Sequence, residues 1–159
     1  GLLFVQLNRD SSWSWQAWAD YLVVMRNPGK NPEPIKTDVT EDEWIKMASP
    51  VWMDIRQTAT LDGNEGKGIA KDAEDEKHLC PLQIPLIERC VRLWSNRGAL
   101  VFDPFAGIFS TPVGAIRNGR LGLGFELKPS YWRQGVRYLE REASLLDQPN
   151  FLDLAEAAG

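Results

Sequence analysis

Long apolar runs are missing from this sequence of 159 residues. No stretch approaches the roughly 18 consecutive apolar residues that a membrane-spanning helix needs, so we expect no membrane partner. The first residues, Gly-Leu-Leu-Phe-Val, have no basic region before them and no small-residue cleavage site after them, which predicts no signal peptide. An initial Met is also missing, which favours a chain that begins inside a longer protein.

Cysteine and histidine are scarce. The sequence has 2 cysteines, Cys80 and Cys90, and 1 histidine, His78. Two cysteines ten residues apart, without a Cys-x-x-Cys motif, make neither a disulfide framework nor a zinc site. We therefore expect no bound metal, reduced thiols and a cytoplasmic protein.

An excess of positive charge is missing as well. The formal net charge is -4 at pH 7, whereas a surface that binds a phosphate backbone is basic. Any contact with nucleic acid is therefore expected from a local patch, or from a part of the parent protein outside this sequence.

The residues that are present have the composition of an ordinary folded domain, with 43% hydrophobic and 25% charged residues. We expect residues 1–159 to form a single domain, truncated from a longer protein. Within it, residues 61–77 contain three glycines and then an acidic run, without apolar periodicity. This pattern predicts a mobile loop.

One strand and one short helix are expected near the amino terminus. Residues 20–26 form an apolar, partly β-branched run that is closed by Asn-Pro-Gly, which predicts a buried strand. Residues 41–48 have an acidic first turn directly after Thr40, a residue type that caps helices. They predict a short helix that Pro50 ends.

From residue 78 onward the pattern becomes regular. One predicted helix face carries residues at spacings i, i+3, i+4 and i+7, namely Ile87, Cys90, Val91 and Trp94. Residues 99–102 are an apolar run of strand length, and a glycine-containing loop follows at 103–107. Thr111 and Pro112 are typical of a helix start, and Gly119 is typical of a helix stop.

Residues 121–125 predict a second buried strand, which ends at Glu126. Residues 130–146 then predict a helix in which Trp132, Val136 and Leu139 share a face. An alternation of strands and helices in this order is typical of parallel sheets. We therefore predict the α/β class, as a partial, doubly wound, Rossmann-like sheet, with residues 78–146 as its cofactor-binding βαβα part.

Three residues indicate which cofactor fits. The loop that contains Gly107 offers backbone N–H groups at a helix start. Glu126 follows Gly107 by 19 residues, near the spacing of about 20 that is typical of an acid that binds a ribose. Asp103 would repel a pyrophosphate, but it suits a cofactor with an ammonium and a sulfonium group. S-adenosylmethionine is therefore favoured over NAD, whose loop has the pattern Gly-x-Gly-x-x-Gly.

Four segments together resemble the β-class DNA N6-adenine/N4-cytosine methyltransferases, and in particular their phage-type members. These segments are His78-Leu-Cys-Pro-Leu-Gln83, the helix with Arg89 and Trp94, Val101-Phe-Asp-Pro-Phe-Ala-Gly107, and Gly122-Leu-Gly-Phe-Glu-Leu-Lys-Pro-Ser-Tyr131. The resemblance implies the carboxy-terminal part of a Rossmann-like methyltransferase, with S-adenosylmethionine as cofactor and DNA as partner. It implies the following cofactor-binding residues: His78, Pro81, Leu82, Asp103, Pro104, Phe105, Gly107, Ser110, Thr111 and Glu126.

Two departures from the family pattern bear on function. The family loop continues as Gly-x-Gly, and here Phe109 replaces the second glycine, which we expect to cost backbone strain or to fill part of the pocket. The family's catalytic Pro-Pro segment holds a flipped base, and none of the 10 prolines here adjoins another. We therefore expect no catalytic residue in this chain, and methyl transfer only in a complete parent enzyme.

Two interpretations of function stay open. The chain is either the cofactor-binding part of a DNA methyltransferase, or a non-catalytic remnant that acts as a binding or structural module. Phe109 and the missing catalytic segment favour the remnant. In both cases a sheet that lacks its remaining strands exposes edges and apolar surface, which predicts a homo-oligomer.

Overall fold

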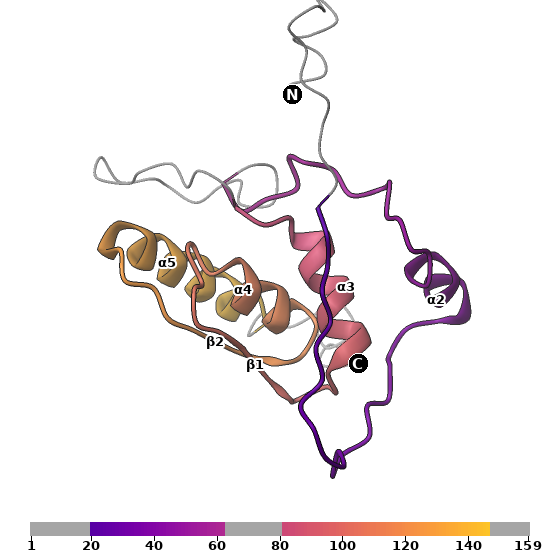
Figure 1. The fold of residues 1–159 in the computed structure, drawn as a ribbon. Helices are drawn as coiled ribbons and strands as arrows, with labels where there is room; N and C mark the ends of the chain where they lie inside the picture. Colours follow the sequence, from indigo (N-terminus) through magenta and orange to yellow (C-terminus); the bar gives the residue numbers. More distant parts are fainter. Residues whose placement is uncertain (1–19, 63–80, 147–159) are drawn as a thin grey trace, which may run out of the picture. The chain divides into compact units, whose positions relative to one another are not determined.

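The computed structural model describes residues 20–62 and 81–146 (Figure 1). Most of the predicted loop 61–77, and also His78, lie outside the described residues. The chain divides into two compact units, residues 1–34 and 35–159. The described helices and strands belong to the second unit, in the order α2 (Glu41–Met47), α3 (Ile84–Trp94), β1 (Leu100–Asp103), α4 (Ser110–Arg117), β2 (Leu121–Gly124) and α5 (Pro129–Leu146).

Strands β1 and β2 form a parallel pair in which Leu100 is opposite Leu121 and Asp103 is opposite Gly124. Helix α4 connects the two strands, and α5 follows β2 (Figure 1). This βαβα order confirms the predicted α/β class with a parallel sheet. Helix α4 ends where Gly119 was expected to stop it, because Gly119 has a φ of 72°, a conformation that favours glycine.

Two glycines of β2 let α4 and the loop before it lie directly against the strand. A Cβ atom at Gly122 would stand 2.6 Å from the carbonyl oxygen of Pro112. A Cβ atom at Gly124 would stand 2.6 Å from the Cβ of Ala106. A side chain at either position would therefore push α4 or its loop away from the sheet.

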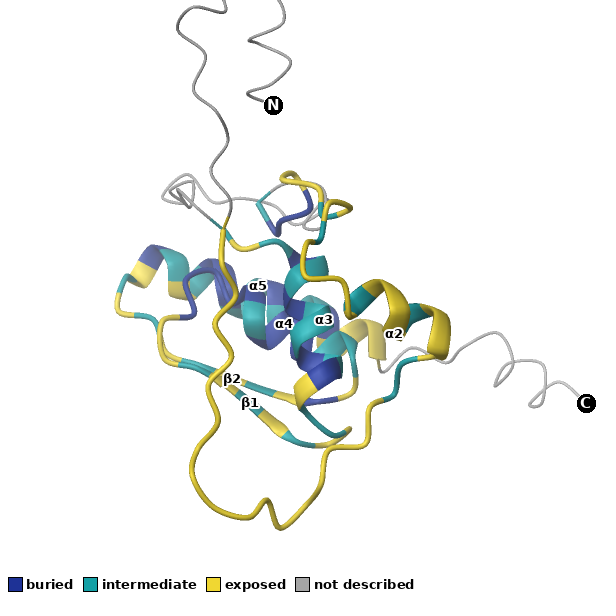
Figure 2. Cartoon of the chain, turned by 45° about the vertical axis from the view of Figure 1, so that its right-hand side comes forward, coloured by how far each residue is buried: buried dark blue, intermediate teal, exposed yellow. Residues whose placement is uncertain are grey.

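The opposite face of the two strands is apolar and exposed. We call it the outer sheet face, and it consists of Leu100, Phe102, Leu121, Leu123 and, just beyond β2, Phe125. Figure 2 shows the two strands in yellow and teal beside the dark blue of α4. Parallel strands are usually covered on both faces, so the prediction of buried strands holds here for one face only. The rings of Phe102 and Phe125 pack edge to face, with centroids 5.5 Å apart.

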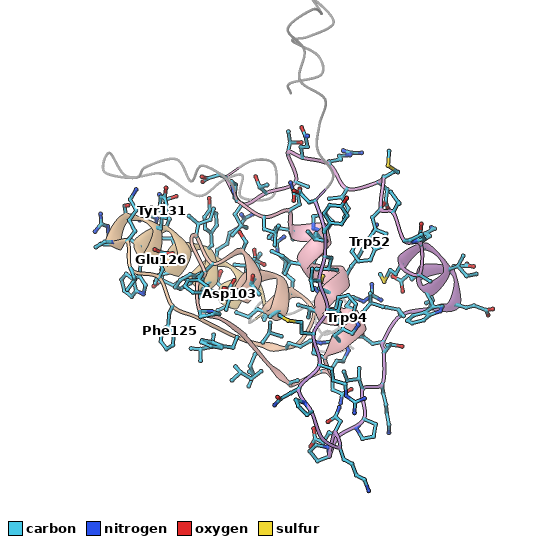
Figure 3. The ribbon with its side chains drawn as sticks, viewed as in Figure 1. Trp52, Trp94, Asp103, Phe125, Glu126 and Tyr131 are labelled. Carbon is cyan, nitrogen blue, oxygen red and sulfur yellow. The ribbon has the colours of Figure 1, made fainter. Side chains whose placement is uncertain are left out.

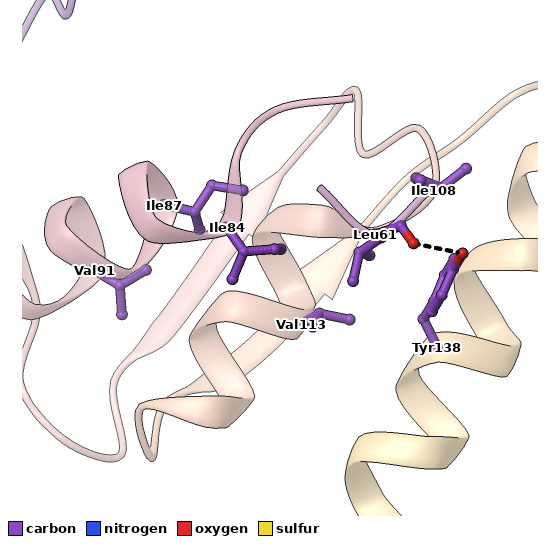
Figure 4. Packing of buried hydrophobic residues seen from close by; sticks show 7 residues of the cluster. All are labelled: Leu61, Ile84, Ile87, Val91, Ile108, Val113 and Tyr138. Atoms are coloured by element: carbon purple, nitrogen blue, oxygen red, sulfur yellow. Dashed lines mark hydrogen bonds between the residues drawn. The ribbon is translucent and has the colours of Figure 1, made fainter. Parts of the chain in front are cut away.

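The buried core gathers side chains from three helices and two loops. Its members are Leu61, Ile84, Ile87, Val91, Ile108, Val113 and Tyr138 (Figure 4). Of the predicted face of α3, Ile87 and Val91 are buried, Cys90 is partly buried and Trp94 is exposed. The hydroxyl of Tyr138 donates a hydrogen bond of 3.0 Å to the carbonyl oxygen of Leu61, which ties the segment before α3 to α5.

Charged groups, rather than apolar burial, hold the segment around α2. This helix buries no residue, and Thr40 caps it as predicted, in a capping box with Glu43. Glu43 accepts two hydrogen bonds of 2.8 Å from Arg92 of α3. Asp38 accepts one of 2.7 Å from Arg120. The side chain of Arg120 is fully buried and also donates to two backbone carbonyl oxygens, so it joins three segments.

The predicted buried strand at residues 20–26 is wrong. These residues form neither a helix nor a strand, and the five apolar side chains from Tyr21 to Met25 are exposed. An apolar run of this kind becomes a buried strand only beside other strands. The one sheet among the described residues pairs β1 with β2 and does not include this run.

Two predicted details of the later helices are also wrong. Thr111 lies inside α4 and does not cap it, because the helix already begins at Ser110. In α5, Trp132 is exposed, whereas Leu139 of the predicted face packs against the core. The buried positions are Ser130, Gln134, Gly135, Tyr138 and Glu142. Most of these residues have side chains that can form hydrogen bonds. The buried face of α5 is therefore not recognisable from the spacing of apolar residues.

We expect Gly122→Ala to lower the free energy of unfolding by about 1–3 kcal/mol, because the added methyl group overlaps the backbone of Pro112. The control is Glu140→Ala at an exposed position of α5, with an expected loss of less than about 0.5 kcal/mol. Urea unfolding followed by circular dichroism measures both values. Equal losses would contradict the close approach of α4 to β2.

The ion pairs around α2 predict an acid-sensitive fold. The hydrogen bond from Arg120 lowers the pKa of Asp38, and the hydrogen bonds from Arg92 lower the pKa of Glu43 to about 2. Carboxyl groups with a lowered pKa stabilise the folded state fully above their unfolded pKa of about 4, and this stabilisation is lost as the pH falls toward the folded pKa.

We therefore expect the melting temperature to fall between about pH 5 and pH 2.5, and to fall less in the variant Asp38→Asn/Glu43→Gln. Differential scanning fluorimetry at a series of pH values measures this difference. The same acid-induced loss in the variant and the wild type would show that other groups control the acid sensitivity.

Candidate functional site

The loop after β1 folds back onto the residues that follow β2. The N–H of Phe125 donates to the carbonyl oxygen of Asp103 at 3.0 Å, and the N–H of Ala106 donates to the carbonyl oxygen of Phe125 at 2.9 Å. The Asp103 carboxylate accepts the N–H of Phe105 at 2.9 Å, which turns the chain sharply at the end of β1. Asp103 and Glu126 consequently lie at the carboxyl ends of neighbouring parallel strands (Figure 3).

The carboxylate of Glu126 connects the two loops at this edge of the sheet. Its Oε2 accepts the N–H of Gly107 at 2.9 Å, and its Oε1 accepts the N–H of Lys128 at 2.7 Å. A carboxylate has about four acceptor positions, so each oxygen keeps one for a further donor. The side chain is therefore fixed in orientation and still able to accept hydrogen bonds from a bound molecule.

Residues 106–109 form a tight turn, closed by a hydrogen bond of 2.8 Å from the N–H of Phe109 to the carbonyl oxygen of Ala106. Gly107 has a φ of 55°, and the turn aims its N–H at Glu126. Ile108 and Phe109 are both buried. The turn therefore directs backbone toward the end of the sheet and large side chains into the interior.

Phe109 shows the backbone strain that we predicted for it. Its φ of 66° makes it the one non-glycine residue with positive φ among the described residues. The conformation is left-handed helical, which is uncommon for a bulky residue. Phe109 also serves as the N-cap of α4, but without a side-chain hydrogen bond to the helix. Its ring is buried against Gly135 of α5.

The other predicted residues of this region surround the turn. Pro104 and Phe105 are exposed, and Phe105 is 88% accessible to solvent. Ser110 is buried and Thr111 is half-buried, both in the first turn of α4. The structure thus gathers Asp103, Gly107, Ser110, Thr111 and Glu126 into one region, where the strands end and α4 begins.

Two further predicted residues come from another element of the fold. Pro81 and Leu82 directly precede α3, on a different element from the loop, and Leu82 is exposed. His78 lies outside the described residues. The part of the prediction that rests on the segment from His78 to Leu82 therefore stays a prediction.

One residue pair that adjoins Glu126 was not predicted from the sequence. The ammonium group of Lys128 lies 4.3 Å from the centroid of the Tyr131 ring, a cation–π contact at the start of α5. The available signal was the i, i+3 spacing of a cation and an aromatic residue at a helix start. The contact holds a positive charge two residues after the Glu126 carboxylate.

Within residues 20–62 and 81–146, no group of three or more His, Cys, Asp or Glu side chains is arranged to hold a metal ion. None of the helices in these ranges is long and apolar enough to cross a membrane.

The sequence profile of the N6/N4 DNA methylases matches residues 8–137. The chain belongs to this DNA methylase family. The DNA adenine methyltransferase YhdJ of Escherichia coli K12 is 41% identical over 68 residues, which are 42% of this chain and 23% of that enzyme. The type II methyltransferase M.ScaI of Streptomyces caespitosus is 34% identical over 79 residues, which are 48% of this chain and 26% of that enzyme.

Solved methylase structures have the same fold. A DNA modification methylase from Thermus thermophilus, solved in complex with S-adenosyl-L-methionine, matches with a TM-score of 0.57 and 26% identity, over 83% of this chain and 49% of the methylase. A second structure of that protein matches with a TM-score of 0.55 and 28% identity, over 74% of this chain and 42% of the methylase. These matches confirm the predicted Rossmann-like methyltransferase fold. The chain spans about a quarter of the curated relatives and about half of the solved methylase.

Glu126 is expected to stabilise the two loops even without a ligand. Glu126→Ala removes the acceptor of two backbone N–H groups and should lower the free energy of unfolding by about 1–3 kcal/mol. The matched control is Glu140→Ala at an exposed position of α5, for which we expect less than about 0.5 kcal/mol. Urea unfolding compares the two variants. A loss no larger than that of the control would contradict the anchoring role.

Proposed function

We propose that this chain binds S-adenosylmethionine and forms the cofactor-binding part of a DNA amino-methyltransferase. The observation that carries the proposal is the position of Asp103 and Glu126 at the carboxyl ends of adjacent parallel strands, on either side of the Gly107 turn. Ligands of open α/β sheets bind outside the carboxyl ends of the strands. Two carboxylates at this edge favour a cofactor that carries positive charge.

The chemistry of the donor set supports this cofactor. The Asp103 carboxylate suits the ammonium group of the methionine part, and the remaining acceptor positions of Glu126 suit the two ribose hydroxyls. Gly107 has no side chain to block approach to the turn. The solved Thermus methylase with the same fold was obtained in complex with S-adenosyl-L-methionine, which supports the assignment.

The bound cofactor would supply a methyl group to an exocyclic amine of DNA, adenine N6 or cytosine N4. Adenine is the better candidate, from the phage-type resemblance and from the relative that is a DNA adenine methyltransferase. The role of this chain is to hold and orient the cofactor. The binding energy of the cofactor then contributes to positioning its methyl group against the amine. The rest of the parent protein would supply the residues that hold the flipped base, and it would make the main DNA contacts. We propose that the parent protein acts in the cytoplasm.

The second candidate is a non-catalytic remnant. It is favoured by Phe109, which occupies the second glycine position of the family loop, and by the absence of adjacent prolines from the sequence. The two candidates differ in cofactor binding, because the remnant has no need to retain it.

Isothermal titration with S-adenosylhomocysteine, which retains the ammonium and ribose groups, distinguishes these candidates. We expect binding by the wild type and a loss of about tenfold or more in affinity for Asp103→Asn and for Glu126→Gln, because each variant removes a charged acceptor. Glu140→Gln is the control, with unchanged affinity. NAD should not compete. No binding by a folded wild-type chain would reject the cofactor-binding part and favour the remnant.

We also propose that the isolated chain self-associates through the outer sheet face. Its five apolar side chains are each at least 43% exposed, and both strands lie in a sheet of only two among the described residues. Exposed apolar surface and free strand edges favour association. Light scattering should give a mass above 18.0 kDa for the wild type. Leu121→Lys/Leu123→Lys should shift it to the monomer, whereas Glu140→Lys should not. A monomeric wild type would contradict the proposal.

A further inference from the structure

Phe109 and Gly135 are in contact, and each of them is a residue type that is unfavourable for the backbone conformation at its position. Phe109 has a φ of 66°, which L side chains rarely adopt, and yet its side chain is only 4% exposed. Gly135 lies inside the long helix α5, where glycine is a poor helix former. The fold places these two residues in contact with each other.

The absence of a side chain at Gly135 is what makes room for the Phe109 ring. A Cβ atom at Gly135 would lie 2.5 Å from the Cγ of Phe109, and 2.8 and 2.9 Å from its two Cδ atoms. Such distances are far below van der Waals contact, so even alanine would displace the ring. The ring is not at the flexible end of a long side chain, because its Cγ is one bond from the Cβ atom. A displaced ring would therefore move the backbone at residue 109.

The backbone at residue 109 belongs to the candidate site. The N–H of Phe109 closes the 106–109 turn on Ala106, and its carbonyl oxygen accepts the N–H of Val113 in the first turn of α4 at 3.0 Å. The same turn aims the N–H of Gly107 at Glu126. A force on the Phe109 ring is thus transmitted to the turn, to the start of α4 and to the Glu126 carboxylate.

We infer that the Phe109 ring, seated against Gly135, locks the 106–109 turn in its ligand-binding shape, so that Phe109 is a positioning residue of the cofactor site. The inference rests on the proposed function where it concerns ligand binding. It replaces the expectation that Phe109 fills part of the pocket, because the buried ring lies against Gly135 of α5. Replacement of Phe109 by glycine then loosens the site and does not open it.

A double-mutant cycle tests the lock without any ligand. Gly135→Ala should lower the melting temperature of the wild type by about 5 °C or more, because the methyl group overlaps the ring. In the Phe109→Ala background the ring is gone, and the same substitution should leave the melting temperature unchanged or raise it, since alanine is the better helix former. An equal decrease in both backgrounds would overturn the lock.

Ligand binding tests the positioning role. Phe109→Gly and Phe109→Ala should bind S-adenosylhomocysteine about tenfold more weakly than the wild type, and Phe109→Leu, which keeps a large apolar side chain, should recover part of the affinity. Ile87→Ala, a core truncation in α3, is the control. It should lower the melting temperature but keep the affinity within about twofold at a temperature where all variants are folded.

The outcomes separate the lock from the proposed function. Tighter binding by Phe109→Gly than by the wild type would overturn the positioning role and show that the ring obstructs the pocket. An equal loss of affinity in Ile87→Ala would reduce Phe109 to a general core residue. If the folded wild type does not bind S-adenosylhomocysteine, the proposed function fails. The change in melting temperature caused by Gly135→Ala in the two backgrounds still decides whether the lock exists.

Discussion

The close approach of α4 to β2 across Gly122 and Gly124 is the constraint on which the rest of the described fold depends. With no side chains between them, the helix and its preceding loop lie directly against the strand. The loop can then exchange backbone hydrogen bonds with Phe125, and Gly107 comes within hydrogen-bond distance of Glu126. The arrangement of the candidate site is thus a consequence of how closely one helix packs against one strand.

The same constraint explains how the site combines rigidity with an open edge. Glu126 is held by two N–H groups, Asp103 by its bond to Phe105, and the turn by the buried side chains of Ile108 and Phe109. These groups are held in place by contacts within the chain itself. Preorganised groups lose less entropy on binding, which favours affinity.

Local signals in the sequence were sufficient to predict this part of the fold. Apolar runs of strand length, a glycine-containing loop and Gly119 each act within a few residues, and together they predict the βαβα order. The proximity of Asp103 and Glu126 follows from that order, because the carboxyl ends of parallel strands meet at one edge.

Contacts between distant residues were not predictable in this way. Asp38 and Arg120 are 82 residues apart, and neither lies in a periodic pattern that would identify its partner. The run at residues 20–26 has the composition of a buried strand, but burial depends on neighbouring strands that its own sequence does not specify.

The contact between Phe109 and Gly135 also has an evolutionary consequence. A large residue at 109 packs best against glycine at 135, so changes at the two positions depend on each other. Phenylalanine at 109 is therefore less destabilising where glycine is already present at 135, and that glycine is costly to replace while phenylalanine remains there. Related chains that retain glycine at the position of residue 109 are free of this restriction and can carry a better helix former at the position of residue 135. The identities at these two positions should therefore vary together, although 26 residues separate them in the chain.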